Sequence, residues 1–354
     1  MYGAIPYELF IALSSTLEIL NVQKNRLVGT LPSSIGMLSQ LTYLNVAYNN
    51  ELTGNLFSSS TISWEKLTNL KSLLLNNNDF NGSIPSTTFS NTNSSNSLKR
   101  LHIHDNEFTG TLDFLDGISS SSTTKIVLEE INISNNMFVG TIPTSISQLT
   151  NLNMIMMGTN QLSGSIPSNI GFTLSNLDTF IVETNYITGT FPWDSFIYST
   201  SESSLSILGC SDTYITGTLP TNTFGSLAST LTLLDFWKTK VTGALPVAIG
   251  ELTNLQHLVL SENALTGTIP TTIGEMKNLT FLSLSQNDFI GTIPNTLGQL
   301  SKLTFLGLSS NDLSGTIPST FNGLSSLEFL GLSVSGLTGV IPEETLGSIE
   351  TLSM

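Results

Sequence analysis

The amino-acid sequence predicts an α/β fold, a right-handed solenoid with a parallel β-sheet on its concave face and 3₁₀ or loosely helical turns on its convex face. Two patterns carry this prediction. A tetrapeptide Gly-x-(Ile/Leu/Phe)-Pro recurs along the whole chain every 24 to 30 residues. A second pattern, Leu-x-x-Leu-x-Leu-x-x-Asn-x-Leu-x-Gly, runs up to these glycines. A unit repeated at such a period builds a solenoid in which each coil contacts only its neighbours.

The repeat accounts for the full length of 354 residues. Fourteen motif glycines align, two of them in units without the proline, and the last four intervals are all 24 residues. They are Gly3, Gly29, Gly54, Gly82, Gly110, Gly140, Gly164, Gly189, Gly217, Gly243, Gly267, Gly291, Gly315 and Gly339. Because one coil cannot bury its leucines alone, we expect residues 1–354 to form a single solenoid domain of about 13 repeats.

Each part of the coil has a physical reason. The Leu-x-Leu step, as in Leu282 and Leu284, has the period of two of a short strand with alternate residues inward. The motif glycine allows a bend, and the proline ends the strand ladder. Apolar residues three apart follow, such as Ile273 and Met276, and this spacing predicts 3₁₀-like turns.

An asparagine column stands where each strand turns away. A buried amide there can bond the backbone of adjacent coils, whose polar groups a tight bend would leave without partners. The asparagines are Asn25, Asn49, Asn78, Asn106, Asn136, Asn160, Asn185, Asn263, Asn287 and Asn311. Thr213, Thr239 and Ser335 replace the asparagine in three units, keeping a hydroxyl of lower hydrogen-bonding capacity.

The composition excludes several classes of protein. The net charge is −15, and no basic stripe is present, so neither nucleic acid nor an anionic membrane surface is an expected partner. An apolar content of 39% argues against a disordered chain. The single cysteine, Cys210, excludes an internal disulfide and any cysteine-based zinc site. No cofactor is expected.

The chain contains no membrane segment by its sequence, because no stretch approaches the roughly 18 apolar residues of a spanning helix. Both ends fall inside the repeat: Gly3–Pro6 lies in mid-motif, and Leu346–Leu352 begins a further unit. We therefore expect a chain truncated at both ends, which leaves room for a membrane-anchored parent protein.

These motifs resemble the leucine-rich-repeat family, in the subtype with Leu-x-Gly-x-Ile-Pro that plant extracellular receptors and polygalacturonase inhibitors carry. The resemblance covers nearly the whole chain. It implies the solenoid fold, an extracellular or cell-surface location, and a receptor-like protein or receptor kinase as the parent. Three features of that family are missing from this sequence: cysteine-paired caps, a signal peptide, and a transmembrane or kinase segment.

Two histidines are the only candidates for a metal site. His102 and His104 alternate on one predicted strand with Asp105 beyond, and two such imidazoles could share a metal with a carboxylate. The alternative is a solvated polar patch beside Lys99 and Arg100. We favour the polar patch, because neither neighbouring unit supplies a third histidine.

The sequence does not predict an enzyme. Cys210 occupies an inward leucine position and is expected to be a small buried hydrophobe rather than a reactive thiol. No strand–glycine-loop–helix unit is present to bind phosphate. No nucleophile can be paired with a base, since His257 is the only histidine in the C-terminal two-thirds. We expect no catalytic residue and no metal site.

Outward strand positions supply the candidate binding surface. In the last six units the residue just before the second strand leucine is apolar or aromatic, above a column of mostly glycine and serine. The apolar and aromatic column runs Ile207, Leu233, His257, Phe281, Phe305 and Phe329. Exposed aromatic side chains in a row are typical of protein-binding surfaces. The alternative is that they pack on each other as a ladder. The predicted ligand-binding residues are Met154, Met156, Ile181, Trp237, His257, Phe281, Phe305 and Phe329.

A second candidate surface is a threonine row. Threonine follows the motif glycine at Thr30, Thr111, Thr141, Thr190, Thr218, Thr268, Thr292 and Thr316. A flat row of hydroxyls and methyls is similar to the surface of ice-binding solenoids, although β-branched residues also simply suit a short extended segment. The row is interrupted at Asn55, Ser83, Ser165, Ala244 and Val340.

Four glycosylation sequons begin at Asn81, Asn93, Asn132 and Asn278. We expect Asn132 to point outward on the strand face, where a glycan would obstruct a ligand. The sequence as a whole is interpreted as a non-enzymatic recognition module that binds a protein or peptide ligand in signalling or defence. A secreted inhibitor similar to polygalacturonase inhibitors and an ice-binding solenoid are the alternatives.

Overall fold

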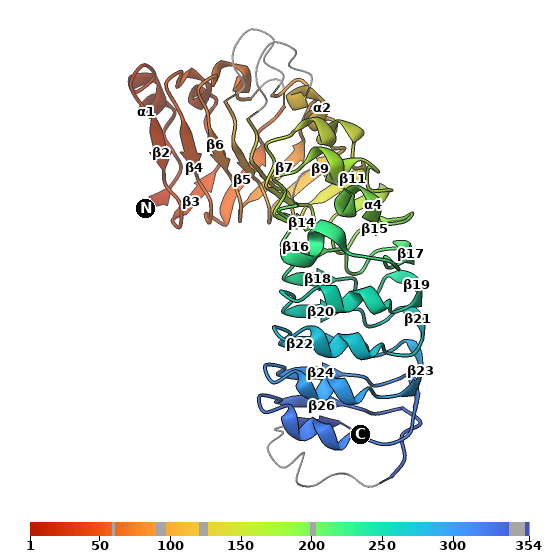
Figure 1. Cartoon of the computed structure of the whole chain (residues 1–354). Helices are drawn as coiled ribbons and strands as arrows, with labels where there is room; N and C mark the ends of the chain where they lie inside the picture. Colours follow the sequence, from red (N-terminus) through yellow and green to blue (C-terminus); the bar gives the residue numbers. More distant parts are fainter. Residues whose placement is uncertain (59–60, 90–96, 120–126, 199–202, 340–350, 354) are drawn as a thin grey trace. The chain divides into compact units, whose positions relative to one another are not determined.

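The computed structural model describes residues 1–58, 61–89, 97–119, 127–198, 203–339 and 351–353. The chain divides into two compact units, Met1–Leu177 and Asp178–Met354. Each unit is a stack of coils with short strands and short helices, which confirms the α/β leucine-rich solenoid class (Figure 1). That both units belong to one domain stays a prediction.

In the first unit the coils contribute strands to two parallel sheets. The front sheet, formed by the Leu-x-Leu strands, contains β2 (Ile19–Asn21), β4 (Tyr43–Asn45), β6 (Ser72–Leu74), β8 (Arg100–His102), β10 (Glu130–Asn132) and β12 (Met154–Met156). The second sheet contains β1 (Tyr2–Gly3), β3 (Arg26–Gly29), β5 (Glu51–Asn55), β7 (Asp79–Ser83), β9 (Glu107–Gly110), β11 (Met137–Thr141) and β13 (Gln161–Gly164). The helical turns are α1 (Tyr7–Ala12), η1 (Ser33–Met37), η2 (Trp64–Lys66), α2 (Phe114–Ser119), η3 (Thr144–Gln148) and α3 (Ile170–Thr173).

The second unit repeats this arrangement. Its front sheet contains β14 (Thr179–Ile181), β16 (Ile207–Gly209), β18 (Leu233–Asp235), β20 (His257–Val259), β22 (Phe281–Ser283), β24 (Phe305–Gly307), β26 (Phe329–Gly331) and β27 (Thr351–Ser353). Its other strands are β15 (Tyr186–Ile187), β17 (Thr216–Thr218), β19 (Lys240–Ala244), β21 (Ala264–Gly267), β23 (Asp288–Thr292) and β25 (Asp312–Ser314). The helical turns are α4 (Trp193–Ile197), η4 (Gly225–Ser229), η5 (Val247–Glu251), η6 (Thr271–Glu275), η7 (Asn295–Gln299) and η8 (Ser319–Gly323).

The front strands alternate as predicted between inward leucines and outward side chains. Leu282 in β22 and Leu306 in β24 are fully buried, whereas Phe281 and Phe305 before them are half-buried. Cys210 takes an inward position and is fully buried, so burial raises the pKa of its thiol well above the usual value. The leucines therefore form the core between the sheets and the helical turns.

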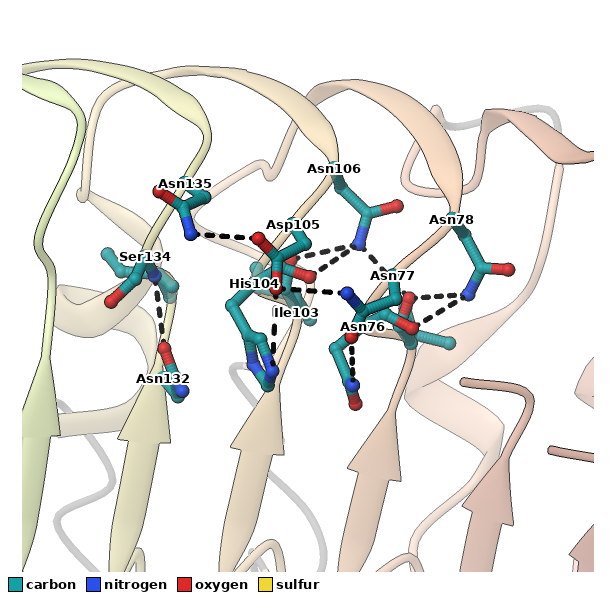
Figure 2. Close-up of polar contacts among 12 residues, drawn as sticks. Asn76, Asn77, Asn78, Ile103, His104, Asp105, Asn106, Asn132, Ser134 and Asn135 are labelled. Carbon is teal, nitrogen blue, oxygen red and sulfur yellow. Dashed lines mark hydrogen bonds and ion pairs between the residues drawn. The ribbon is translucent and has the colours of Figure 1, made fainter. Parts of the chain in front are cut away.

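The asparagine column bonds adjacent coils as predicted. The Asn160 amide donates to the carbonyl of Ile133 one coil earlier at 3.0 Å and to Met157 in its own coil at 3.2 Å. Its side-chain oxygen accepts from the Phe138 amide of the earlier coil at 3.0 Å. Figure 2 shows the same position at Asn78 and Asn106, where each amide group reaches backbone carbonyls. One side chain thus satisfies several backbone groups that a tight bend exposes.

The second sheet is a feature that the sequence patterns did not predict. The motif glycines lie within or beside its strands with positive φ, as at Gly291 (φ 78°), which confirms the need for glycine there. The threonine of the preceding coil covers this backbone: Thr268 Cγ2 lies 3.0 Å from the position that a Cβ on Gly291 would take. A side chain at the glycine would collide with the coil stacked on it.

The residue just before each asparagine-column position adopts the left-handed backbone conformation, which sequence reasoning also missed. Among the described residues these φ values lie between 49° and 59°. The residues are Lys24, Tyr48, Asn77, Asp105, Asn135, Thr159, Thr184, Asp212, Lys238, Glu262, Gln286, Ser310 and Val334. Asparagine and aspartate tolerate this conformation best, so Asn77, Asp105 and Asn135 are well suited to it.

Candidate ligand-binding face

The aromatic row is assembled on adjacent strands of the second unit. The register pairs His257 with Phe281, Phe281 with Phe305, and Phe305 with Phe329. The Phe281 and Phe305 rings stack with centroids 4.2 Å apart at 8°, and those of Phe305 and Phe329 stack at 4.5 Å and 4°. The His257 ring is tilted by 41° on Phe281 at 5.9 Å. The rings therefore pack on each other as a ladder, as the alternative interpretation of this column predicted.

The floor beside this ladder consists of small residues for a steric reason. A Cβ on Gly307 would lie 3.1 Å from Cε1 of Phe305, and a Cβ on Gly331 would lie 3.1 Å from Cε1 of Phe329. Neither glycine has a positive φ, so space rather than backbone conformation requires glycine here. Because the ring faces cover each other, the half-buried rings offer mainly their edges to a ligand.

Trp237 lies outside the ring stack, in the column next to the small-residue floor. Its side chain is 38% exposed, and its Nε1 donates to Glu262 Oε1 at 3.1 Å. The Lys238 ammonium lies 5.5 Å from the centre of the Trp237 ring and forms an ion pair with Asp212 at 2.8 Å. This part of the face is therefore polar, and the indole is held in one orientation by its neighbours.

Two half-buried carboxyls lie at the ends of front strands in the second unit: Asp235 ends β18, and Glu183 follows β14 by two residues. Burial raises the pKa of Asp235, although hydrogen bonds from the Trp237 amide (2.9 Å) and the Ser211 hydroxyl (3.3 Å) oppose the shift. Burial also raises the pKa of Glu183, and the negative charge of Asp235 adds to it. Neither residue was predicted from the sequence, although Asp235 stands in the column of mostly glycine and serine beside the aromatic row.

The structure does not bring all predicted ligand-binding residues into one cluster. Met154 and Met156 lie on β12 of the first unit, half-buried and outward, whereas the aromatic row belongs to the second unit. Ile181, on β14 of the second unit, is half-buried and lies 3.6 Å from the position of a Cβ on Gly209. Whether any of these eight residues binds a ligand remains a proposal.

The two histidines of the first unit lie in a polar patch. His102 Nε2 is 2.9 Å from Glu130 Oε2 on the next strand, and the two imidazole rings are 6.1 Å apart. Burial lowers the pKa of His102 most, opposed by Glu130 and assisted by Arg100. Burial likewise lowers the pKa of His104, opposed by Asp105. Glu130 was not predicted as a partner of these histidines, although the strand register places it beside Arg100.

Asp105 bridges three consecutive coils just beyond these histidines (Figure 2). Its carboxylate accepts from Asn77 at 3.1 Å on one side and from Asn135 at 2.8 Å on the other. His104 Nε2 lies 3.9 Å from the same carboxylate. The Asp105 carboxylate therefore accepts a hydrogen bond from each neighbouring coil. Because both of its oxygens already have these partners, it is poorly placed to act as a metal ligand.

Three further predictions from the sequence concern metal binding, membrane-spanning segments and glycosylation. Within the described residues, no three His, Cys, Asp or Glu side chains gather closely enough to hold a metal ion. No helix in the described ranges combines the length and the apolar character needed to cross a membrane. Asn132 occupies an outward column as expected but is only 9% exposed and accepts from the Ser134 amide at 3.1 Å, so its amide offers little surface for a glycan. Asn93 and Val340 lie outside the described residues.

The fold and this face define the class: a repeat protein of stacked coils with a front sheet that leaves its outward side chains accessible. Sequence comparison agrees. Two family models, both described as leucine-rich repeat, match this chain, one over residues 229–289 and the other over residues 16–38, 127–149 and 302–324. No curated protein matches the sequence. These matches identify leucine-rich repeats in both units, and the fold is that of a leucine-rich-repeat solenoid.

Solved structures with this fold include plant receptor ectodomains. A TDR receptor is 27% identical with a TM-score of 0.83, and the match covers 98% of this chain and 56% of that one. The PEPR1–AtPEP1 complex is 29% identical with a TM-score of 0.82, covering 99% and 49%. The Arabidopsis receptor kinase HAESA is 28% identical with a TM-score of 0.76, covering 99% and 59%. This chain thus spans about half the length of the chains it matches.

Proposed function

We propose that this chain is the recognition part of a receptor-like protein or receptor kinase ectodomain and binds a peptide or protein along its front sheet. In this proposal it acts outside the cell, in signalling or defence, and has no catalytic activity of its own. The observation that supports it most is the likeness over 98–99% of this chain to receptor ectodomains. The similar structure of HAESA is in complex with the peptide hormone IDA and the co-receptor SERK1.

The front sheet of the second unit has physical properties that suit this role. The edges of Phe281, Phe305 and Phe329 form an apolar strip over a glycine and serine floor, and Trp237 adds a half-exposed indole. The stacked rings and the tethered indole lose little conformational entropy when a ligand binds, since their neighbours already fix them. Aromatic side chains held in this way are the residues that most often dominate a binding interface.

A random-peptide display library on the purified chain would test this proposal. We expect enriched peptides whose affinity falls by about ten-fold or more in Phe305→Ala and Trp237→Ala, because an aromatic anchor at an interface is worth about 2 kcal/mol or more. Isothermal titration calorimetry measures the affinity. The matched control is Val247→Ala, which removes a 68% exposed apolar side chain from η5, away from the front sheet.

Two results would contradict the proposal. One is a library that yields no peptide above the background of an unrelated leucine-rich-repeat protein. The other is a set of peptides whose affinity is unchanged by Phe305→Ala and Trp237→Ala. Circular dichroism of each variant separates loss of binding from loss of structure, because Phe305 also packs between two neighbouring rings.

A further inference from the structure

A pocket in the second unit lies away from the front sheet and arises from an irregular coil. In the regular coils the helical turn begins directly after the motif proline, as at Val247 after Pro246. After Pro220, by contrast, η4 begins only at Gly225. The longer connection leaves a pocket of about 230 Å³ between α4 and residues 218–223. A second pocket, beside Trp64 in the first unit, holds only about 20 Å³, room for about one water molecule.

Two residues of the pocket wall, Thr223 and Trp193, are held by contacts with residues outside the lining. The Glu251 carboxylate accepts from the Thr223 hydroxyl and from the Phe224 amide, both at 2.9 Å. On the opposite wall, Trp193 packs against Phe191 at 4.5 Å and stacks on Phe236 at 5.4 Å and 24°. Thr223 and Trp193 are therefore held in place before any ligand arrives, and binding would not have to order these two side chains.

Apart from Thr223, the polar side chains that line the pocket form no hydrogen bond to another protein group in the described structure, and all of them except Trp193 are exposed to solvent. These side chains are Trp193, Asp194, Tyr198, Thr218, Thr221 and Asn222. Similar side chains elsewhere in this unit bond to a neighbouring coil: Thr242 donates to the Gly217 carbonyl at 3.3 Å, and Asn254 donates to the Ser229 carbonyl at 2.7 Å. In the free protein these side chains bond to water, and a ligand that enters the pocket must replace those hydrogen bonds with its own.

The chemistry of the lining selects one class of ligand. It contains no Lys, Arg or His, so an anion such as a phosphate would find no counter-charge. It combines acceptors (the Asp194 carboxylate) with donors (the Trp193 indole and the Asn222 amide). A cation would be attracted to the Asp194 carboxylate but has no lone pair to accept from the indole and amide donors, which it would leave unmatched. Each hydroxyl of a sugar both donates and accepts, and the apolar face of a sugar ring can lie on an aromatic side chain.

We propose that this pocket binds a single neutral sugar ring, such as the terminal residue of a glycan. Its volume agrees with this size, since it is below the roughly 300–1,000 Å³ of pockets that enclose drug-sized ligands. A ligand of about a dozen heavy atoms in such a site has a dissociation constant on the order of 1 mM. The site is separate from the front sheet and does not depend on the function proposed for that face.

Saturation-transfer difference NMR with glucose, galactose, mannose, xylose and N-acetylglucosamine, each offered alone, tests this inference on the whole chain. We expect saturable binding of at least one of these sugars. We expect Asn222→Ala and Asp194→Ala to weaken it about five-fold each, the effect of one lost hydrogen bond. Thr221→Trp should abolish binding by filling the pocket.

Asn295→Ala is the matched control, because Asn295 is an exposed asparagine at the start of η7 in a regular coil. It should leave sugar binding unchanged. None of the substituted pocket side chains has a hydrogen bond to lose, so melting temperatures should stay near the wild-type value. The inference is overturned if no sugar binds, if the pocket variants bind as the wild type does, or if tetramethylammonium binds at this site in place of the sugars.

Discussion

The two units are built from the same kind of coil but carry different outward side chains on their front sheets. In the first unit the outward side chains of β8 and β10 are polar: Glu130 is paired with Arg100 in the strand register, and its carboxylate lies 2.9 Å from His102 Nε2. In the second unit the corresponding positions on β20 to β26 hold a stacked aromatic row. Beneath both surfaces lie the same buried leucines and the same asparagine column. The repeat thus dictates the inward residues and leaves the outward ones free to differ.

The physical basis of this freedom is the geometry of the coil. Alternate residues of a front strand point to opposite sides, so an outward substitution leaves core packing unchanged. Outward side chains interact instead with the same position one coil earlier and one coil later. An outward surface is therefore set column by column, and each unit can present a different surface without changing its fold.

The largest expected effect tests whether the asparagine column stabilises both units to the same extent. Asn160→Ala in the first unit and Asn287→Ala in the second should each lower the free energy of unfolding by about 3 kcal/mol, because each leaves buried backbone groups without partners. The Asn287 side chain accepts from the Leu265 amide at 3.0 Å and donates to the Leu260 carbonyl at 2.9 Å. Chemical denaturation combined with hydrogen exchange near each site measures the loss.

The exposed Asn295→Ala provides the control and should change the free energy of unfolding by less than about 0.5 kcal/mol. A large difference between the losses in free energy of unfolding of Asn160→Ala and Asn287→Ala would contradict this expectation, since it would mean that the asparagine column does not stabilise the two units equally. Hydrogen exchange is needed because coils of a repeat protein can open separately, so one global transition could average the two units.

An intermediate effect tests the steric role of the glycine floor in the second unit. Gly307→Ala places a Cβ 3.1 Å from Phe305 Cε1 and 3.0 Å from Ser285 Oγ, so it should destabilise the protein by about 1–2 kcal/mol. Gly209→Ala occupies the same column, but its nearest contact is Ile181 at 3.6 Å, an ordinary packing distance. It should be neutral or slightly stabilising, since alanine restricts the unfolded chain. Equal losses in thermal melts would show that the rings do not require glycine.

The smallest expected effect is a pH dependence of opposite sign in the two units. His102 and His104 have pKa values below the usual 6.5 in the folded chain, so the unfolded chain binds more protons and the first unit loses stability as pH falls through 6.5. Glu183 and Asp235 have raised pKa values, so the second unit loses stability as pH rises above their unfolded values of 4.5 and 3.8.

Hydrogen exchange at β8 and β18 between pH 7.5 and 5, corrected for intrinsic rates, measures this difference. Protection at β8 should fall toward pH 5, and protection at β18 should hold or rise. His102→Gln should remove much of the dependence at β8, and Asp235→Asn should remove it at β18. If protection changes in the same direction in both units and persists in these variants, the histidines and carboxyls are not its cause.

Much of the fold could be predicted because it depends on local spacing. The 24- to 30-residue period, the Leu-x-Leu step and asparagines such as Asn160 specify contacts between neighbouring coils that recur along the chain. The second sheet was missed, since its strands form around the motif glycine, where sequence reasoning expects a bend. Glu130 and Asp105 were missed as partners because their contacts join residues about 30 positions apart.

The sequence by itself determined that this chain stacks coils, which residues point inward, and which positions require glycine, because those properties repeat with every unit. The tertiary structure decided how the outward residues combine. Only the folded chain shows that the faces of Phe281, Phe305 and Phe329 cover each other and that the connection after Pro220 leaves a pocket beside Trp193. These outcomes depend on ring orientation and on the length of one irregular coil, which column patterns do not specify.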